Sequence, residues 1–168
     1  MSSKDASHAV FTALQRRAEA GGVRVRSPQS KRAPQEHPAE FSTHHNGKKR
    51  TRLDIVLRFD EGADGHEITD HDAVILAHEM GHWRRWLAGM HPSYRSEILE
   101  TAGASALLYS DPLSLSPDLL AVIYDEERAA WDLGRAELAA VGFENWALFE
   151  SLQLARLNEY RAALRLLP

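Results

Sequence analysis

The chain has 168 residues, of which 43% are hydrophobic and 26% charged, and its formal net charge is −4. These values are typical of one globular domain, residues 1–168, with a real core, and they point to no particular charged partner. The chain has no cysteine, which excludes a disulfide framework, a thiolate metal site and a cysteine nucleophile. Its apolar runs are too short to span a membrane.

Hydrophobic periodicity and turn signals predict an α+β fold in which a helix and two or three short strands precede four helices. The predicted helices are 6–20, 70–88, 94–109, 117–140 and 145–166, and the predicted strands are 23–26, 41–43 and 52–59. Because the strands come before helix 70–88, we expect a small, mostly antiparallel sheet packed on one side of that helix.

Two helix starts carry clear capping signals. Thr69-x-x-Asp72 approximates a capping box for the helix that Gly89 should end. Ser116-Pro117-Asp118 combines a cap, a proline at the first helical position and an acid near the positive end of the helix dipole.

Basic residues dominate the early part of the chain. Between Arg16 and Arg52 there are ten Lys or Arg residues against three Glu. We interpret 27–50 as a mobile, solvated basic loop around the short strand 41–43. Phe41 is its only aromatic residue, so a nucleic-acid partner is not expected. The N-terminus has no apolar signal core, which predicts a cytoplasmic protein with no membrane partner.

The motif His78-Glu79-x-x-His82 is the most informative stretch. On a helix, residues four apart share one face, so both imidazoles can bind one side of a tetrahedral Zn²⁺. Glu79 can reach a metal-bound water without binding the metal, which suits a general base. Apolar neighbours predict a buried helix, where such groups are costly unless paired or metal-bound. A solvated helix with surface histidines is the alternative.

A catalytic zinc needs a third protein ligand and an open position. Downstream, Glu127 shares an apolar helix face with Ala130, Trp131 and Gly134, and a carboxylate in such a stripe is expected to bind a cation. Glu126 is its nearest rival, and the sequence leaves the choice between them open. The two could also belong to an acidic surface cluster.

His78-Glu79-x-x-His82 followed by Glu127-x-x-Ala130 resembles the gluzincin metallopeptidases. The compact size and the order helix, strands, helix most resemble the ImmA/IrrE-like neutral zinc metallopeptidases. The resemblance implies a single metallopeptidase-like domain, with Zn²⁺ held by His78, His82 and Glu127 and with Glu79 as catalytic base. An extended protein or peptide substrate would lie against strand 52–59.

The chain departs from that pattern at two points. One is the gap of roughly 45 residues between His82 and Glu127, which is longer than expected for the ImmA/IrrE type. Many gluzincins carry an Asp four residues after the third ligand, where this chain has Trp131. Ligand histidines normally need an outer partner that orients them, and Asp72 or Asp132 could serve.

The expected function is therefore a zinc-dependent peptidase in which Glu79 moves the proton of a zinc-bound water. Tyr124 lies one turn before Glu127 and is our candidate for stabilising the oxyanion, with Tyr109 and His91 as alternatives. The rival hypothesis is a non-catalytic, zinc-stabilised binding or regulatory module. A metal-free helical protein is a third, weaker hypothesis.

Overall fold

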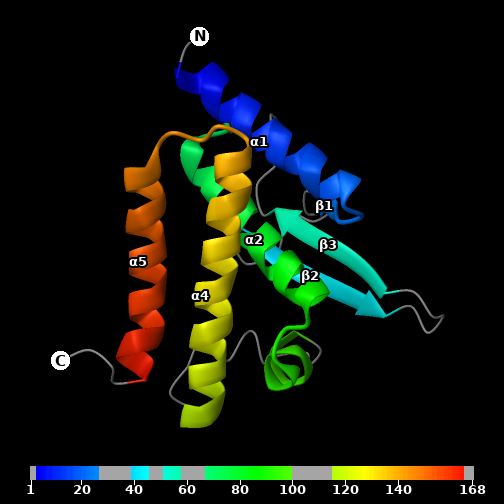
Figure 1. Ribbon diagram of the computed structural model, residues 1–168, viewed down its shortest axis with the longest axis vertical. Coiled ribbons are helices and arrows are strands. Elements are labelled where there is room, and N and C mark those ends of the chain that lie inside the picture. The colour runs from blue at the N-terminus through cyan, green and yellow to red at the C-terminus, as the bar shows by residue number, and fades with distance from the viewer. Residues whose placement is uncertain (1–2, 27–38, 46–50, 58–66, 100–114, 165–168) are drawn as a thin grey trace.

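The computed structural model describes residues 3–26, 39–45, 51–57, 67–99 and 115–164. These residues form an α+β fold, as predicted (Figure 1). The elements are α1 (Ser3–Ala20), β1 (Arg24–Arg26), β2 (Ala39–His45), β3 (Thr51–Leu57), α2 (Asp70–Ala88), η1 (Tyr94–Leu99), α4 (Pro117–Ala140) and α5 (Trp146–Ala163).

The sheet is mixed rather than mostly antiparallel, with the strand order β1-β3-β2. β2 pairs antiparallel with β3, but β1 pairs parallel with it. A buried charge accounts for the place of β1. Asp54 of β3 is fully buried, and Arg24 and Arg26 of β1 bind its carboxylate at 3.2 and 3.0 Å. Parallel pairing sets Arg24 opposite Asp54.

The central position of β3 corrects one expectation. This strand, predicted as 52–59, was expected to hold an extended substrate. β2 pairs along the whole of one edge, and β1 pairs with residues 54–56 on the other, so the middle of β3 has a neighbouring strand on both edges. The apolar side chain of Ile55 is fully buried, and such a strand takes the middle of a sheet rather than an edge.

The prediction of a basic loop over 27–50 is wrong for 39–45, which form β2. This strand is longer than the predicted 41–43, because backbone pairing with β3 runs from Ala39↔Leu57 to His45↔Thr51. Because β2 consists mostly of polar residues, hydrophobic periodicity does not reveal its full length. The flanking segments 27–38 and 46–50 lie outside the described residues.

Helix α2 has both predicted caps. Thr69 and Asp72 form the capping box, and Gly89 follows the helix in the left-handed conformation with φ 90°. In Figure 1, α2 passes between the sheet and α4. Its residues Ala73, Val74, Leu76, Ala77 and Met80 are fully buried. The motif helix is therefore the middle layer of the core.

The two C-terminal helices run side by side (Figure 1). Ser116 caps α4, as predicted, and Asn145 caps α5, which was predicted to start there. α4 ends at Ala140, and Gly142, with φ 76°, makes the turn that follows. The predicted end of α5 at 166 lies outside the described residues. Among the helices that the structure describes, none has an apolar stretch long enough to span a bilayer.

The predicted helix 94–109 is helical over 94–99, but with π geometry. These six residues form the π-helix η1, and residues 100–109 lie outside the described part of the chain. π-turns close i→i+5 hydrogen bonds and are often found at functional sites.

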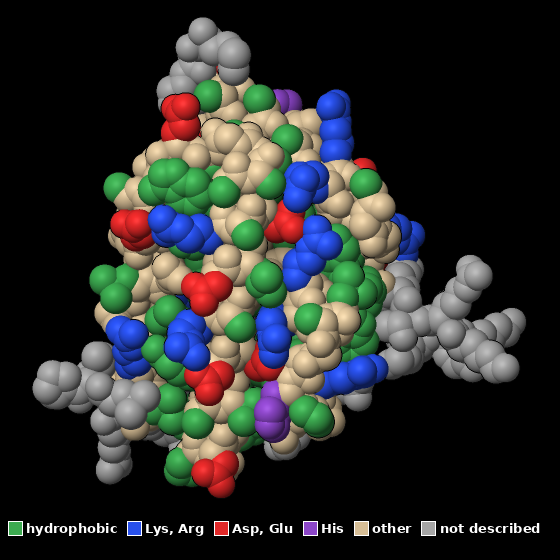
Figure 2. All heavy atoms as spheres, in the orientation of Figure 1, with side chains coloured by type: hydrophobic (Ala, Val, Ile, Leu, Met, Phe, Trp, Pro, Cys, Tyr) green, Lys and Arg blue, Asp and Glu red, His purple; other side chains and the backbone are tan. Residues whose placement is uncertain are grey.

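Charged side chains of both signs are spread over the face that α4 and α5 present (Figure 2). Exposed ion pairs there include Arg128–Asp125 and Arg135–Glu150, each at 3.3 Å. Such pairs contribute little to stability. They also leave this face without a patch of one sign that would attract a highly charged partner.

Helices α2 and α4 approach each other through two glycines. A Cβ at Gly81 of α2 would overlap the backbone carbonyl of Ala130 of α4. A Cβ at Gly134 of α4 would lie 2.8 Å from the carbonyl oxygen of Ala77 of α2. Both obstacles are backbone atoms that cannot rotate away, so each contact requires glycine.

We predict that Gly81→Ala destabilises the protein by about 1–3 kcal/mol, the usual cost of overpacking. The helix propensity of alanine, worth about 1 kcal/mol, offsets only part of this loss. Urea unfolding of the purified variant measures it. Ala136→Ser on the exposed face of α4 is the control, with a change within about 0.5 kcal/mol. A Gly81→Ala protein as stable as the wild type would contradict the close contact.

Candidate metal centre

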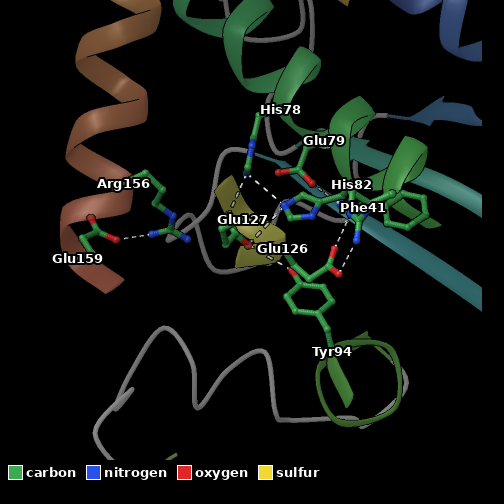
Figure 3. Close-up of polar contacts among 10 residues, drawn as sticks. Phe41, His78, Glu79, His82, Tyr94, Glu126, Glu127, Arg156 and Glu159 are labelled. Carbon is green, nitrogen blue, oxygen red and sulfur yellow. Dashed lines mark hydrogen bonds and ion pairs between the residues drawn. The ribbon is translucent and has the colours of Figure 1, made fainter. Parts of the chain in front are cut away.

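Three side chains from two helices converge in the core (Figure 3). His78 and His82 project from one face of α2, as their spacing predicts, and Glu127 meets them from α4. The two Nε2 atoms lie 3.2 Å apart. The Glu127 carboxylate oxygens lie 3.3 Å from Nε2 of His78 and 3.4 Å from Nε2 of His82. This group could hold a metal ion.

All three side chains are buried, and Glu127 is 2% exposed. Their carboxylate–imidazole distances exceed the usual 2.9–3.0 Å of an N–H···O bond. These contacts are therefore weak as hydrogen bonds. The grouping of the three side chains is better explained by a shared metal ion. Such an ion would offset the cost of burying them.

The charges of the cluster shift two pKa values in opposite directions. Burial alone lowers the pKa of His82, but the negative charge of Glu127 and its polar contact raise it above the ordinary 6.5, with help from Glu79 and Glu126. Burial raises the pKa of Glu127, but His82 and His78 bring it well below the ordinary 4.5. The metal-free site thus favours a carboxylate beside a protonated imidazole.

Glu126, the rival third ligand, is engaged elsewhere. Both of its oxygens bind the guanidinium of Arg85 of α2, at 2.7 and 2.8 Å. The backbone N–H of His91 also donates to it, at 2.7 Å. Burial raises the pKa of Glu126, but the Arg85 hydrogen bond and the His91 amide lower it below its ordinary value. Glu126 is an ion-pair partner, and Glu127 is the carboxylate that faces the histidines.

In Figure 3, Glu79 lies beside His78 and His82 and reaches toward Phe41 of the sheet. It is 8% exposed, and the backbone N–H of Phe41 in β2 donates to its Oε2 at 2.6 Å. The structure therefore places this carboxylate next to the ligand His78 in the chain and against the edge strand β2. Sequence reasoning did not foresee that partner.

The structure does not bring Tyr124 together with the three ligands. Its hydroxyl accepts a hydrogen bond of 3.0 Å from Nε of Arg161 on α5. Tyr94 of η1 takes the position near the ligands instead, since its hydroxyl donates to Oε1 of Glu127 at 3.2 Å (Figure 3). No spacing rule links Tyr94 to the motif, so sequence reasoning missed it. Of the alternatives, His91 is exposed and Tyr109 lies outside the described residues.

Neither acid expected to orient a ligand histidine does so. Asp72 accepts hydrogen bonds from the N–H and hydroxyl of Thr69 at the helix cap, both at 2.8 Å. Asp132 is exposed. Trp131, which replaces the usual acid, stacks on the ring of His78 with the ring centroids 4.2 Å apart.

Comparisons of this chain with family models, with curated proteins and with solved structures find no match. The likeness to the gluzincins stays a prediction carried by His78, Glu79, His82, Glu127 and Ala130.

We predict that Glu127→Ala weakens zinc binding by more than about 100-fold, because even outer partners of metal ligands are worth about 10–100-fold. Glu126→Ala is the matched control. It removes the neighbouring carboxylate and should keep zinc affinity within about tenfold, as expected for a group outside the ligand set. Competition with a chromogenic chelator measures both. Loss of zinc from Glu126→Ala alone would show that the wrong carboxylate has been assigned.

Zinc affinity should also depend on pH. Metal ligands must be deprotonated, so below the raised pKa of His82 the ion has to displace a proton. Affinity should then fall about tenfold for each unit of decreasing pH, as one displaced proton requires. Titrations from about pH 8 to about pH 5, which bracket an ordinary histidine, measure this.

The variant Glu79→Gln tests whether His82 is the group that causes this pH dependence. Glu79 helps to raise the pKa of His82, so its neutral replacement should move the onset of the affinity loss to lower pH. An affinity that stays constant across the range in both proteins would contradict a protonated His82 in the metal-free site.

Proposed function

We propose that this protein is a zinc-dependent peptidase that hydrolyses peptide bonds in an extended protein or peptide segment. His78, His82 and Glu127 are the proposed zinc ligands, and Glu79 is the proposed general base. The observation that carries the proposal is the close grouping of ligand atoms, one from each residue, within 4.8 Å of one another. The two Nε2 atoms lie 3.2 Å apart, and each lies 3.3 or 3.4 Å from one of the two Glu127 oxygens. Tetrahedral zinc holds N and O ligands at about 2.0–2.2 Å, which sets them about 3.3–3.5 Å apart.

The identity of the donors supports zinc at a catalytic site. Two imidazoles and one carboxylate match catalytic zinc sites, which keep a fourth position for water, whereas structural sites are closed by four protein ligands. When bound, zinc would lower the pKa of its water and polarise the substrate carbonyl.

The way in which buried carboxylates are neutralised also supports a cation at Glu127. Among the described residues, buried Asp54, Glu126 and Glu137 are each bound by arginine. Glu127 is equally buried but faces two histidines. Imidazoles supply a positive charge only when protonated or when they hold a metal ion.

The contact of Glu79 with β2 supports its proposed role as the general base. The amide of Phe41 holds its Oε2, and Oε1 is the oxygen that we assign to proton transfer. As a base it would accept the proton of the attacking water, and it would then donate that proton to the leaving amine. The first transfer protonates Glu79 and the second restores its carboxylate, so the proton balances over one turnover.

The edge strand β2 is the proposed docking place of the substrate, because β3 lies between β2 and β1 in the sheet. An extended peptide can add to a sheet edge through backbone hydrogen bonds. The amide of Phe41 bonds the Glu79 side chain, so β2 meets the site at this residue. A peptide carbonyl that accepted the hydrogen bond of the Phe41 amide would free the Glu79 carboxylate next to the bound peptide.

The second candidate function is a zinc-stabilised module without activity. One observation favours it: the 2.6 Å bond from Phe41 gives Glu79 a structural partner that ties α2 to β2. In such a module Glu79 would have only a structural role. The variant Glu79→Gln, which keeps the shape of the side chain, would then be tolerated.

Glu79→Gln separates the two functions. For a peptidase, the variant should keep zinc and lose hydrolysis by at least about 10²–10⁴-fold, the usual contribution of a general base. The probes are denatured casein and a fluorogenic peptide library, and zinc content is measured on the same samples. The control is Glu126→Gln, which changes the neighbouring carboxylate outside the ligand set and should keep activity. Equal hydrolysis by wild type and Glu79→Gln would remove Glu79 from the mechanism.

A further inference from the structure

Each ligand histidine lies against a nearly parallel aromatic ring. The ring of His78 and that of Trp131 are 23° from parallel, with centroids 4.2 Å apart. The ring of His82 and that of Tyr94 are 11° from parallel, with centroids 6.1 Å apart. Figure 3 shows Tyr94 reaching from η1 toward the site. Offset parallel rings are a favoured arrangement of aromatic side chains.

The hydrogen bonds that normally orient ligand histidines are missing from the described part of the structure. Nδ1 of His78 and Nδ1 of His82 are both buried, and no described group bonds either of them. The nearby acids are occupied or turned outward. Asp72 caps α2, Glu79 binds the Phe41 amide, Glu126 binds Arg85, and Asp132 is exposed.

We propose that Trp131 and Tyr94 are positioning residues that hold the two ligand imidazoles by ring contact, in place of hydrogen bonds at Nδ1. This proposal rests on the metal site of the proposed function but not on hydrolysis. Trp131 acts on His78, and Tyr94 acts on His82.

Both supporting rings are themselves fixed. Trp131 is 2% exposed and packs edge-on against Phe149 of α5, with centroids 5.5 Å apart. Tyr94 is 3% exposed, and its hydroxyl bond to Glu127 anchors its far end. A fixed ring limits rotation of the imidazole stacked on it, so the Nε2 atoms stay directed at one metal position.

Ring contact and a hydrogen bond do different things to a ligand. A carboxylate on Nδ1 fixes the tautomer and makes the imidazole a stronger donor. A stacked ring fixes only the plane of the imidazole. Since Nε2 must be free of a proton to bind metal, the proton lies on Nδ1, where here it meets no described acceptor. The two imidazoles are thus well oriented but not made more basic.

Tyr94 contacts two ligands in two ways, through its ring on His82 and through its hydroxyl on Glu127. Tyr94→Phe removes the hydroxyl and keeps the ring, whereas Tyr94→Leu removes both. Trp131→Phe and Trp131→Leu make the same comparison of ring and no ring beside His78. The control Trp146→Leu removes a tryptophan that, like Trp131, packs edge-on against Phe149.

Zinc affinity, measured by competition with a chromogenic chelator, is the test. Tyr94→Leu and Trp131→Leu should each bind zinc about 10–100-fold more weakly than the wild type, the range typical of lost outer support. Tyr94→Phe, Trp131→Phe and Trp146→Leu should stay within about tenfold of the wild type, below that range. Circular dichroism checks that each variant is folded.

Several outcomes would overturn the proposal. Wild-type affinity in both leucine variants would show that the rings do not position the ligands. A Tyr94→Phe protein as weak as Tyr94→Leu would assign the effect to the hydroxyl. A wild-type protein that binds no zinc would remove the metal site and with it the proposed function, whereas zinc binding without hydrolysis would remove only the peptidase.

A measurement on the wild type remains decisive if a leucine variant does not fold. Nitrogen-15 NMR of the zinc-loaded protein, labelled at histidine, reports the tautomer and any coupling across a hydrogen bond at Nδ1. We expect metal-bound Nε2 and a protonated Nδ1 with no such coupling in both ligands. Detection of a coupling from either Nδ1 to a carboxylate or carbonyl would contradict the proposal.

Discussion

The close backbone contact between α2 and α4 is the constraint on which the site depends. Gly81 lies against Ala130, and Gly134 lies against Ala77, so the two helices meet with no side chain between them at these points. Glu127 is one turn before Ala130, and this separation places its short carboxylate directly on the imidazoles of α2. A wider spacing would leave the carboxylate short of the histidines and admit water. The glycine within H-E-x-G-H and the alanine of E-x-x-A therefore pack the two helices together beside the candidate ligands.

Burying three ionisable side chains at that contact is costly unless something neutralises them. At three other buried carboxylates the described core uses arginine, as at Glu137, which is bound by Arg17 and Arg84 at 2.9 and 2.7 Å. That cluster also joins α1, α2 and α4, and it frames the helices around the site. At Glu127 the partners are histidines, whose charge depends on a proton or a metal ion. Proton and metal would compete for the same atoms, which couples metal binding to pH.

The features set by local sequence were predictable. The caps at Thr69 and Ser116, the helix around His78 and the pairing of His78 with His82 follow from short-range rules of spacing and capping. Glu127 could be selected from its apolar helix face, but only tertiary contacts separate it from Glu126, since Arg85 is 41 residues away in the chain. The length of β2 was underestimated because the strand is stabilised by its pairing with β3, which the local sequence does not show. Tyr94 lies near the site because the chain turns back toward it after Gly89. No local sequence pattern predicts that turn.

A crystal structure of the zinc-loaded protein, with anomalous diffraction recorded on both sides of the zinc absorption edge, tests the central claim most directly. The account predicts one anomalous peak per chain between α2 and α4, bound by Nε2 of His78, Nε2 of His82 and the Glu127 carboxylate. One coordination position should be filled by water. Zinc bound at any other group of side chains, or a peak with four protein ligands and no water position, would contradict the account.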